Sequence, residues 1–299
     1  MKARGIPPIS NDFPLSVYTY LMSKNKAFET DMRKLLTALF LTAVTMITTE
    51  VAAQNSDTNH FTIGVQDFED YSPYSRYQQQ NYQGFNRELF DAFAREYNYY
   101  FDYQALPLKR LYSAFLRGDV DLKYPDNPNW SASLKEGHDI LYSDPVVSFV
   151  DGVVTLDQAQ ENTTGTLTRL GLISGFTPWP FIEKVKAKEI TLFEVKEMES
   201  LIRLLASNRI DGIYTNVAAL NIKLKDLGEQ APPMKLNKHH PYLSGTRHLS
   251  SIKRPDIVIQ FNLFLESHQE LIAQLKAQHG IQEAEEILGS DDLNKSPKK

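Results

Sequence analysis

The 299-residue sequence contains no cysteine. This absence excludes a disulfide framework, a thiolate zinc site, an iron–sulfur cluster and a cysteine nucleophile. The sequence also lacks a serine nucleophile elbow, a zinc-protease helix motif and a phosphate-binding P-loop, so we expect no catalytic centre and no cofactor. The adjacent His239 and His240 have no third ligand nearby in the sequence. We therefore expect no metal site.

A strong basic charge is lacking as well, because 32 Lys and Arg stand against 37 Asp and Glu, for a net charge of −5. Nucleic-acid surfaces need clustered basic side chains, so no nucleic-acid partner is expected. Tryptophan is scarce, with 2 residues, whereas Tyr and Phe are plentiful, with 15 and 16. So many aromatic rings must pack in cores or line a binding site.

A short apolar run at 35–47 follows two basic residues and precedes small residues that end at Ala53. This order is typical of a secretory signal peptide, and the run is too short to span a bilayer, which needs about 20 apolar residues. We predict a signal peptide at 32–53 and a periplasmic product. Without cysteine, that product is not lipidated. Because Met32 can begin the signal, residues 1–31 are expected to be a spurious extension.

Strand and helix patterns alternate twice along the rest of the chain, which predicts largely parallel sheets covered by helices. The polar, Tyr-rich stretch 66–83 predicts a loop. The first series comprises a strand at 61–65, a helix at 85–97, a helix that opens at Pro107 and ends at Gly118, and a strand at 120–124. The second series comprises strands at 170–173, 190–195 and 210–214 and helices at 198–207 and 217–227.

The two series share one local pattern. Gly118 and Asn208 each end a helix, and each is followed three residues later by an aspartate that opens a strand, Asp121 and Asp211. Gly and Asn tolerate the left-handed conformation that ends helices. The pattern could reflect ordinary helix-to-strand turns. Together with the repeated element order, it favours two similarly built lobes.

Six stretches in this order resemble periplasmic solute-binding proteins of family 3, the amino-acid-type substrate-binding proteins of ABC transporters. These stretches are Gly84–Leu89, Pro107–Asp121, Tyr142–Pro145, Gly175–Thr177, Leu205–Asp211 and Pro255–Glu266. The resemblance implies an α/β, two-lobed type II periplasmic-binding-protein fold. Each lobe would be a mostly parallel sheet flanked by helices, and two crossover strands would join the lobes.

The resemblance also implies where the lobes begin and end. Lobe 1 would comprise 60–148 plus 239–284, and lobe 2 would comprise 149–238. The polar residues 285–299 are expected to form a disordered tail. A protein of this kind is expected to be a monomer that works with the permease of an ABC importer or with a membrane sensor.

Open α/β sheets bind ligands beyond the carboxyl ends of their strands, which points to the loops that follow each strand. Aromatic residues there could form walls, Thr177 with neighbouring backbone N–H groups could form an anion cradle, and Asp126 could pair with a cation. Asp126 could instead make an Asx turn, and Arg110 could be a solvated helix residue. The candidate ligand-binding residues are Tyr71, Tyr74, Arg110, Asp126, Trp130, Phe176, Thr177, Trp179 and Asn216.

The chain departs from the family where amino-acid binders carry an arginine that clamps the ligand carboxylate. No arginine lies between Trp130 and Tyr142, and Lys135 could substitute only as a point charge. The ligand class therefore stays open among amino-acid-like solutes, amines, peptides and other polar solutes.

The expected function is binding of a small polar solute by cleft closure, for delivery to an ABC importer. One alternative is a ligand-sensing module for a membrane signalling receptor. Another is a dehydratase-like enzyme on the same fold, with Asp126 in its cleft.

Overall fold

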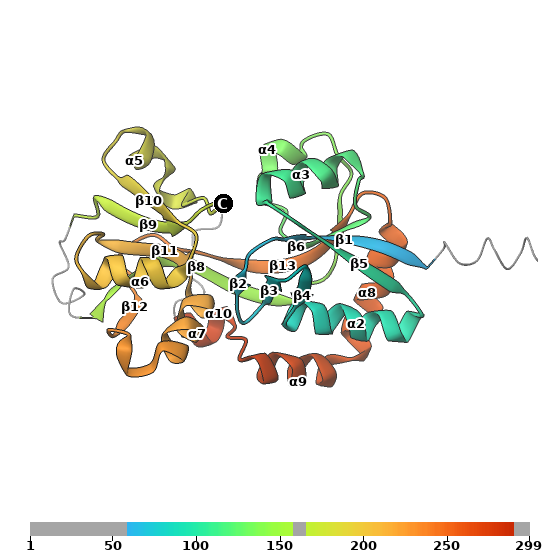
Figure 1. Ribbon diagram of the computed structural model, residues 1–299. Coiled ribbons are helices and arrows are strands. Elements are labelled where there is room, and N and C mark those ends of the chain that lie inside the picture. The colour runs from blue at the N-terminus through green and yellow to red at the C-terminus, as the bar shows by residue number, and fades with distance from the viewer. Residues whose placement is uncertain (1–58, 158–165, 290–299) are drawn as a thin grey trace, which may run out of the picture. The chain divides into compact units, whose positions relative to one another are not determined.

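A computed structural model describes residues 59–157 and 166–289 (Figure 1). The predicted signal peptide, the stretch before it and the last ten residues lie outside the described residues. Within the described ranges, no helix combines the length and apolar character that crossing a membrane requires.

Lobe 1 is built around three parallel strands, with β1 in the middle and β5 and β6 on either side. Phe61, Ile63 and Val65 of β1 alternate into the core, as expected of a half-buried strand. Gly64 allows α3 to pack closely, because Leu111 lies 2.6 Å from the position that a Cβ would occupy. The elements are β1 (His60–Gln66), α2 (Phe85–Tyr97), β5 (Tyr100–Leu106), α3 (Leu108–Arg117), β6 (Leu122–Asp126), α4 (Ala132–Lys135), α8 (Pro255–Ser267) and α9 (Gln269–His279).

Lobe 2 repeats this plan around the parallel strands β9, β10 and β11, with β9 in the middle. Leu201, Ile202 and Leu205 of α6 form the buried face that packs on the sheet. The elements are β9 (Arg169–Ile173), the 3-10 helix η2 (Trp179–Phe181), α5 (Ile182–Lys186), β10 (Thr191–Val195), α6 (Met198–Ala206), β11 (Gly212–Asn216), α7 (Val217–Leu227), the 3-10 helix η3 (Gly228–Gln230) and β12 (Met234–Leu236).

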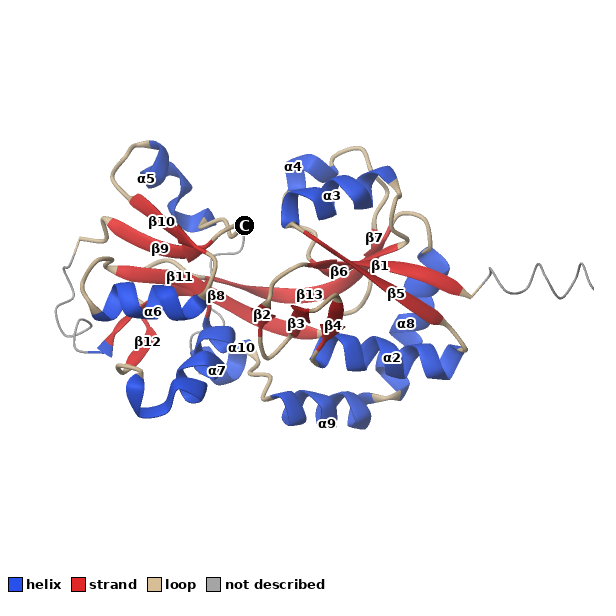
Figure 2. Cartoon of the chain, in the orientation of Figure 1, coloured by secondary structure: helices blue, strands red, loops and turns tan. Residues whose placement is uncertain are grey.

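Two long antiparallel strands, β8 (Val147–Leu156) and β13 (Leu243–Ser251), join the lobes. β8 also pairs with β11 and β12 of lobe 2, and β13 with β6 of lobe 1 and β7 (Leu141–Tyr142). Ten of the described strands thus form one sheet through both lobes, eight of them in the order β10-β9-β11-β8-β13-β6-β1-β5, with β12 paired to β8 and β7 paired to β13. Figure 2 shows β8 and β13 running between the two sets of helices.

The shared turn pattern is confirmed. Gly118 and Asn208 both have positive φ, 77° and 55°, in the left-handed region. Each following aspartate accepts a hydrogen bond from a backbone N–H of the neighbouring strand: Asp121 from Thr62 of β1 at 2.9 Å, and Asp211 from Arg169 of β9 at 2.7 Å. The aspartates therefore tie one strand to its neighbour in both lobes.

The prediction of a loop at 66–83 was wrong. A small antiparallel sheet forms there from β2 (Asp70–Tyr71), β3 (Ser75–Gln78) and β4 (Asn81–Gln83). Its strands are two to four residues long, too short for a clear alternation of apolar and polar residues. The helix that was expected to open at Pro107 begins one residue later, at Leu108, and Pro107 is the N-cap of α3.

The C-terminal segment continues further than expected. A helix, α10 (Ala284–Leu288), occupies the start of the predicted tail, and a capping box between Glu283 and Glu286 stabilises its first turn. Leu288 is buried in the core of lobe 2, whereas α9 packs against α2 of lobe 1. Between the two helices, Glu283 accepts a 2.6 Å hydrogen bond from the backbone of Ser148 on β8. The chain therefore passes between the lobes a third time.

Candidate functional site

A cavity of about 90 Å³ lies where both lobes meet the two crossover strands. We call it the aromatic cavity. The loops after β1 and β6 line it from lobe 1, the loop after β9 lines it from lobe 2, and β8 and β13 contribute Asp151, Leu243 and Arg247. Five of the predicted ligand-binding residues line it: Tyr71, Trp130, Phe176, Thr177 and Trp179.

Aromatic rings from the two lobes meet at one side of this cavity. Phe68 of lobe 1 stacks on Phe176 of lobe 2 with ring centroids 5.7 Å apart, and Tyr71 lies 5.9 Å from the same Phe176 ring. On lobe 1, Trp130 packs beside Phe149 of β8 at 5.4 Å. Trp179 of lobe 2 is 49% exposed. These rings provide apolar walls that could enclose a small ligand.

Arg247 of β13 is the buried cation of the aromatic cavity, with 2% of its surface exposed. Its guanidinium carbon lies 3.7 Å from the centroid of the Tyr74 ring, and its Nη2 donates a 3.0 Å hydrogen bond to the Tyr71 hydroxyl. Nε and Nη1 are also buried, and neither has a hydrogen-bond partner. A buried guanidinium with two free donors is costly, and a bound anion could satisfy them.

Asp151 of β8 is the anionic counterpart in the same cavity. Asn216, at the end of β11, donates a 3.0 Å hydrogen bond from Nδ2 to its Oδ1. Burial raises the pKa of Asp151, while the charge of Arg247 and the Asn216 hydrogen bond act in the opposite direction. The residue thus combines limited hydration with a fixed orientation, and a bound cation would stabilise its ionised form.

Tyr74 and Asn216, two of the predicted ligand-binding residues, do not line the aromatic cavity. Tyr74 is buried beneath the Arg247 guanidinium. Asn216 is fully buried, where it orients Asp151 and also caps α7 by accepting a 3.1 Å hydrogen bond from the N–H of Ala219. Both residues therefore support side chains that line the cavity.

The prediction that Asp126 contacts a ligand cation was wrong. Asp126 is fully buried, and its Oδ1 lies 3.0 Å from Lys123 Nζ and 2.8 Å from Lys135 Nζ. Ser250 donates a 2.7 Å hydrogen bond to Oδ2. We call Lys123, Asp126, Lys135 and Ser250 the Asp126 cluster. Lys135 is committed to this cluster, so it does not substitute for the absent carboxylate clamp.

Arg110 is not brought to either cavity, and its contact with a ligand stays a prediction. The side chain lies exposed on α3 and lines neither of the two cavities between the lobes. The helix turns its apolar side, including Leu111 and Phe115, toward the sheet, and this leaves Arg110 on the solvent side. The alternative, a solvated helix residue, therefore fits the structure.

The expected anion cradle at Gly175–Thr177 lacks the helix it requires. Gly175 has φ 98°, but the chain continues into the three-residue η2 and the five-residue α5. The N-cap of η2 is Pro178, and no side chain caps it. Such short helices have little dipole to offer an anion. Thr177 lines the aromatic cavity without a capping role.

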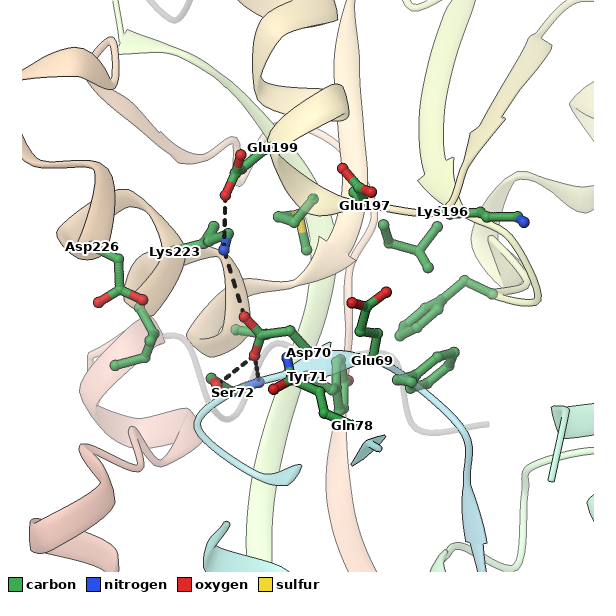
Figure 3. A pocket seen from close by; sticks show the side chains of 16 residues that line it. Glu69, Asp70, Tyr71, Ser72, Gln78, Lys196, Glu197, Glu199, Lys223 and Asp226 are labelled. Atoms are coloured by element: carbon green, nitrogen blue, oxygen red, sulfur yellow. Dashed lines mark hydrogen bonds and ion pairs between the residues drawn. The ribbon is translucent and has the colours of Figure 1, made fainter. Parts of the chain in front are cut away.

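A second cavity, of about 250 Å³, lies on the other side of the Phe68, Tyr71 and Phe176 rings. We call it the acidic cavity, because five of its lining residues are Asp or Glu. Figure 3 shows Lys223 of α7 between Asp70 of lobe 1 and Glu199 of α6. Its Nζ lies 3.5 Å from Asp70 and 3.0 Å from Glu199. An ion-pair bridge therefore connects the two lobes beside the aromatic contact.

Within the described ranges, no group of three or more His, Asp or Glu is arranged to hold a metal ion.

No protein-family profile matches the sequence, and no curated protein matches it. Solved structures do share its fold. An ABC uptake transporter substrate-binding protein from Streptococcus pneumoniae with bound histidine has a TM-score of 0.59 and 16% identity, over 77% of this chain and 96% of that chain. An arginine transport-system periplasmic binding protein from Legionella pneumophila has a TM-score of 0.55 and 14% identity, over 74% and 100%. The chain has the two-lobed type II periplasmic-binding-protein fold.

A third solved structure is an ancestral amino-acid-binding protein described as a precursor of cyclohexadienyl dehydratase. It has a TM-score of 0.57 and 15% identity, over 76% of this chain and 97% of that chain. Binding proteins and a precursor of an enzyme thus share this fold.

The sequence analysis missed Asp151 and Arg247. A signal for Asp151 was present, because it is the one charged residue in the otherwise apolar and small stretch 146–155. A charge in such a strand needs a buried partner or a function. Arg247 lies in a mixed polar strand, where nothing marks it as buried.

Proposed function

We propose that this chain is a periplasmic protein that binds a small polar solute between its lobes and delivers it to the permease of an ABC importer. The observation that carries this proposal is the aromatic cavity, which is lined by both lobes and both crossover strands and contains a buried arginine with free donors. The fold match to solved amino-acid and arginine-binding proteins, which covers 96–100% of their chains and 74–77% of this one, supports the same function. The lobe boundaries proposed are 60–148 plus 239–284 for lobe 1 and 149–238 for lobe 2.

The proposed mechanism is closure by population shift. A ligand that contacts both lobes only in the closed state stabilises that state by its differential affinity. Phe68, Tyr71 and Trp130 of lobe 1 and Phe176 and Trp179 of lobe 2 would make these contacts. The rings would exclude water from the charged groups at the crossover strands and so strengthen their interactions.

A dehydratase-like activity has weaker support, because the carboxylate proposed for it, Asp126, already binds two lysines and a serine.

Tryptophan fluorescence tests the proposal directly, because the 2 Trp residues of the chain both line the aromatic cavity. The purified exported protein is titrated with amino acids, amines, peptides and sugars, and its thermal midpoint is measured in parallel. We expect a saturable fluorescence change and a raised midpoint for one solute class. Trp130→Phe and Trp179→Phe, one in each lobe, assign the change to each ring. No response across the library would contradict the proposal.

A further inference from the structure

The acidic cavity contains a lysine that carboxylates of both lobes share. Lys223 of α7 lies 3.0 Å from Glu199 of its own lobe and 3.5 Å from Asp70 of lobe 1 (Figure 3). Its side chain is 23% exposed, so both contacts are partly shielded from water. None of these three side chains lines the aromatic cavity. The Lys223 bridge therefore joins the lobes outside the surface that is proposed to hold the solute.

Each end of the Lys223 bridge is also held by its own lobe. Ser72 donates hydrogen bonds from its backbone N–H and its Oγ to Asp70 Oδ1, at 3.1 and 2.6 Å, and Arg76 lies 3.4 Å from the same oxygen. On lobe 2, Glu199 stays beside the Lys223 ammonium. Separating the lobes thus leaves neither Asp70 nor Lys223 without a partner, which would be the costly outcome. The contact between them can form and break reversibly.

Both end groups of the bridge remain charged at neutral pH. Burial acts to raise the pKa of Asp70, but the hydrogen bonds from Ser72 and the charge of Lys223 lower it overall. Burial acts to lower the pKa of Lys223, but Glu199 and Asp70 raise it overall. Salt is therefore the condition that should modulate the bridge, because screening weakens interactions between partly exposed charges.

The other charges of the acidic cavity oppose closure of the lobes. Its acids come from both lobes: Glu69 and Asp70 from lobe 1, and Glu197, Glu199 and Asp226 from lobe 2. Carboxylates that approach across the gap repel one another. Lys196 also lines the cavity, but it is exposed, and Figure 3 shows it pointing away from Lys223. Lys223 is thus the cation of this cavity that contacts carboxylates on both sides.

We propose that Lys223 is an electrostatic latch, which holds the lobes together through Asp70 and offsets the repulsion between the facing carboxylates of the acidic cavity. The proposal rests on the proposed function only for its effect on solute affinity. Phe68 and Tyr71 lie on either side of Asp70 in the sequence, and both rings meet Phe176 of lobe 2. Engaging the latch therefore brings together the rings that wall the aromatic cavity.

The distance between the lobes tests the latch without any solute. The chain has no cysteine, so Lys109→Cys on α3 and Glu189→Cys before β10 can each carry one spin label. At about 0.01 M salt, Lys223→Met should lower the ratio of short-distance to long-distance populations about 2- to 5-fold. At about 1 M salt, where repulsion is screened, the ratio of the variant should rise to that of the unmodified protein. Identical distributions for both proteins at low salt would overturn the proposal.

A second substitution identifies Asp70 as the partner and separates the latch from general damage to the fold. In the unmodified background, Asp70→Asn removes an attraction and should favour the long distance. In the Lys223→Met background, the same change removes a repelling carboxylate and should favour the short distance. Lys186→Met, which removes an exposed pair within lobe 2, is the control and should leave the distances unchanged. A shift of the same sign in both backgrounds would overturn the assignment.

Solute titration distinguishes failure of the latch from failure of the proposed function. The probes are amino acids, amines, peptides and sugars. Because Lys223 does not line the aromatic cavity, Lys223→Met should lower the affinity for every solute that binds by one common factor, about 2- to 5-fold. Losses that differ widely between solutes would assign Lys223 to direct contact and overturn the latch. Distances that respond as expected, with no solute bound, would contradict the proposed function and leave the latch intact.

Discussion

Two groups of buried charges lie near the aromatic cavity, and they differ in how far the protein satisfies them. In the Asp126 cluster, every charge has protein partners, including Lys123 Nζ on the Pro125 carbonyl at 2.9 Å and Lys135 Nζ on the Asn127 carbonyl at 2.7 Å. At Arg247 on β13, by contrast, two guanidinium nitrogen atoms have none. The comparison separates charges that the fold itself pairs from a charge that it leaves partly unpaired, which residue type and location in a loop could not do.

The largest effect should follow from Asp126→Asn. The substitution leaves Lys123 and Lys135 buried with no counter-ion, and breaking a buried ion pair from one side costs about 3 to 5 kcal/mol. Urea denaturation should show a free energy of unfolding lowered by that amount. A loss below about 1 kcal/mol would mean that the cluster does not act as a structural unit.

Arg247→Met should behave in the opposite way. It removes two unsatisfied buried donors along with one hydrogen bond and a ring contact, so the free energy of unfolding should change by less than about 1 kcal/mol. Ligand affinity should nevertheless fall about 10- to 100-fold. Denaturation and titration of the same preparation give both values. A stability loss as large as that of Asp126→Asn would remove the distinction between the two groups.

The free energy of unfolding should depend on pH through Lys123 of the Asp126 cluster. Burial lowers the pKa of Lys123 to about 8, against the attraction of Asp126. Between about pH 8 and the ordinary pKa of 10.5, the unfolded chain binds the proton and the folded chain releases it. Stability contributed by this group therefore rises with pH in that window, by at most about 1.4 kcal/mol per pH unit. Denaturation midpoints of the unmodified protein and Lys123→Met, compared from pH 7.5 to 10, isolate this rise, which the variant should lack.

The smallest effect is expected at the partly exposed bridge of Lys223 with Asp70 and Glu199. Lys223→Met should lower stability by about 0.5 kcal/mol, because such pairs are screened by solvent. The same change should weaken ligand affinity slightly, since Asp70 and Lys223 belong to different lobes. Both effects should vanish in 1 M salt, where screening acts within about 3 Å. Lys186→Met, which removes an exposed pair within lobe 2, is the control and should leave affinity unchanged.

Local sequence patterns predicted most of the framework. The helix at 85–97 has the predicted bounds, and the strand-opening aspartates Asp121 and Asp211 play matching roles in both lobes. These features depend on periodicity and on turn conformation, which neighbouring residues specify. The short strands of β2, β3 and β4 depend on pairing with each other, which no single stretch reveals.

The site was harder to predict because its chemistry depends on contacts between distant residues. Asp126 is unavailable because Ser250, far along the chain, and two lysines surround it. Arg247 is buried because Tyr74 and Tyr71 cover it from another part of the sequence. Aromatic residues in the loops after the strands indicated the position of the cavity more reliably than charged residues did. Trp130, Phe176 and Trp179 all line it.

The third passage of the chain between the lobes has a mechanical consequence. Two adjacent strands can both bend and twist relative to one another, but the segment from α9 to α10 is anchored to both lobes and, through Glu283, to Ser148 on β8. A third tether away from the plane of the two strands restrains torsion more than flexion. The lobes should therefore rotate about a single hinge axis with little twist. The same aromatic rings of the two lobes should then meet each time the protein closes.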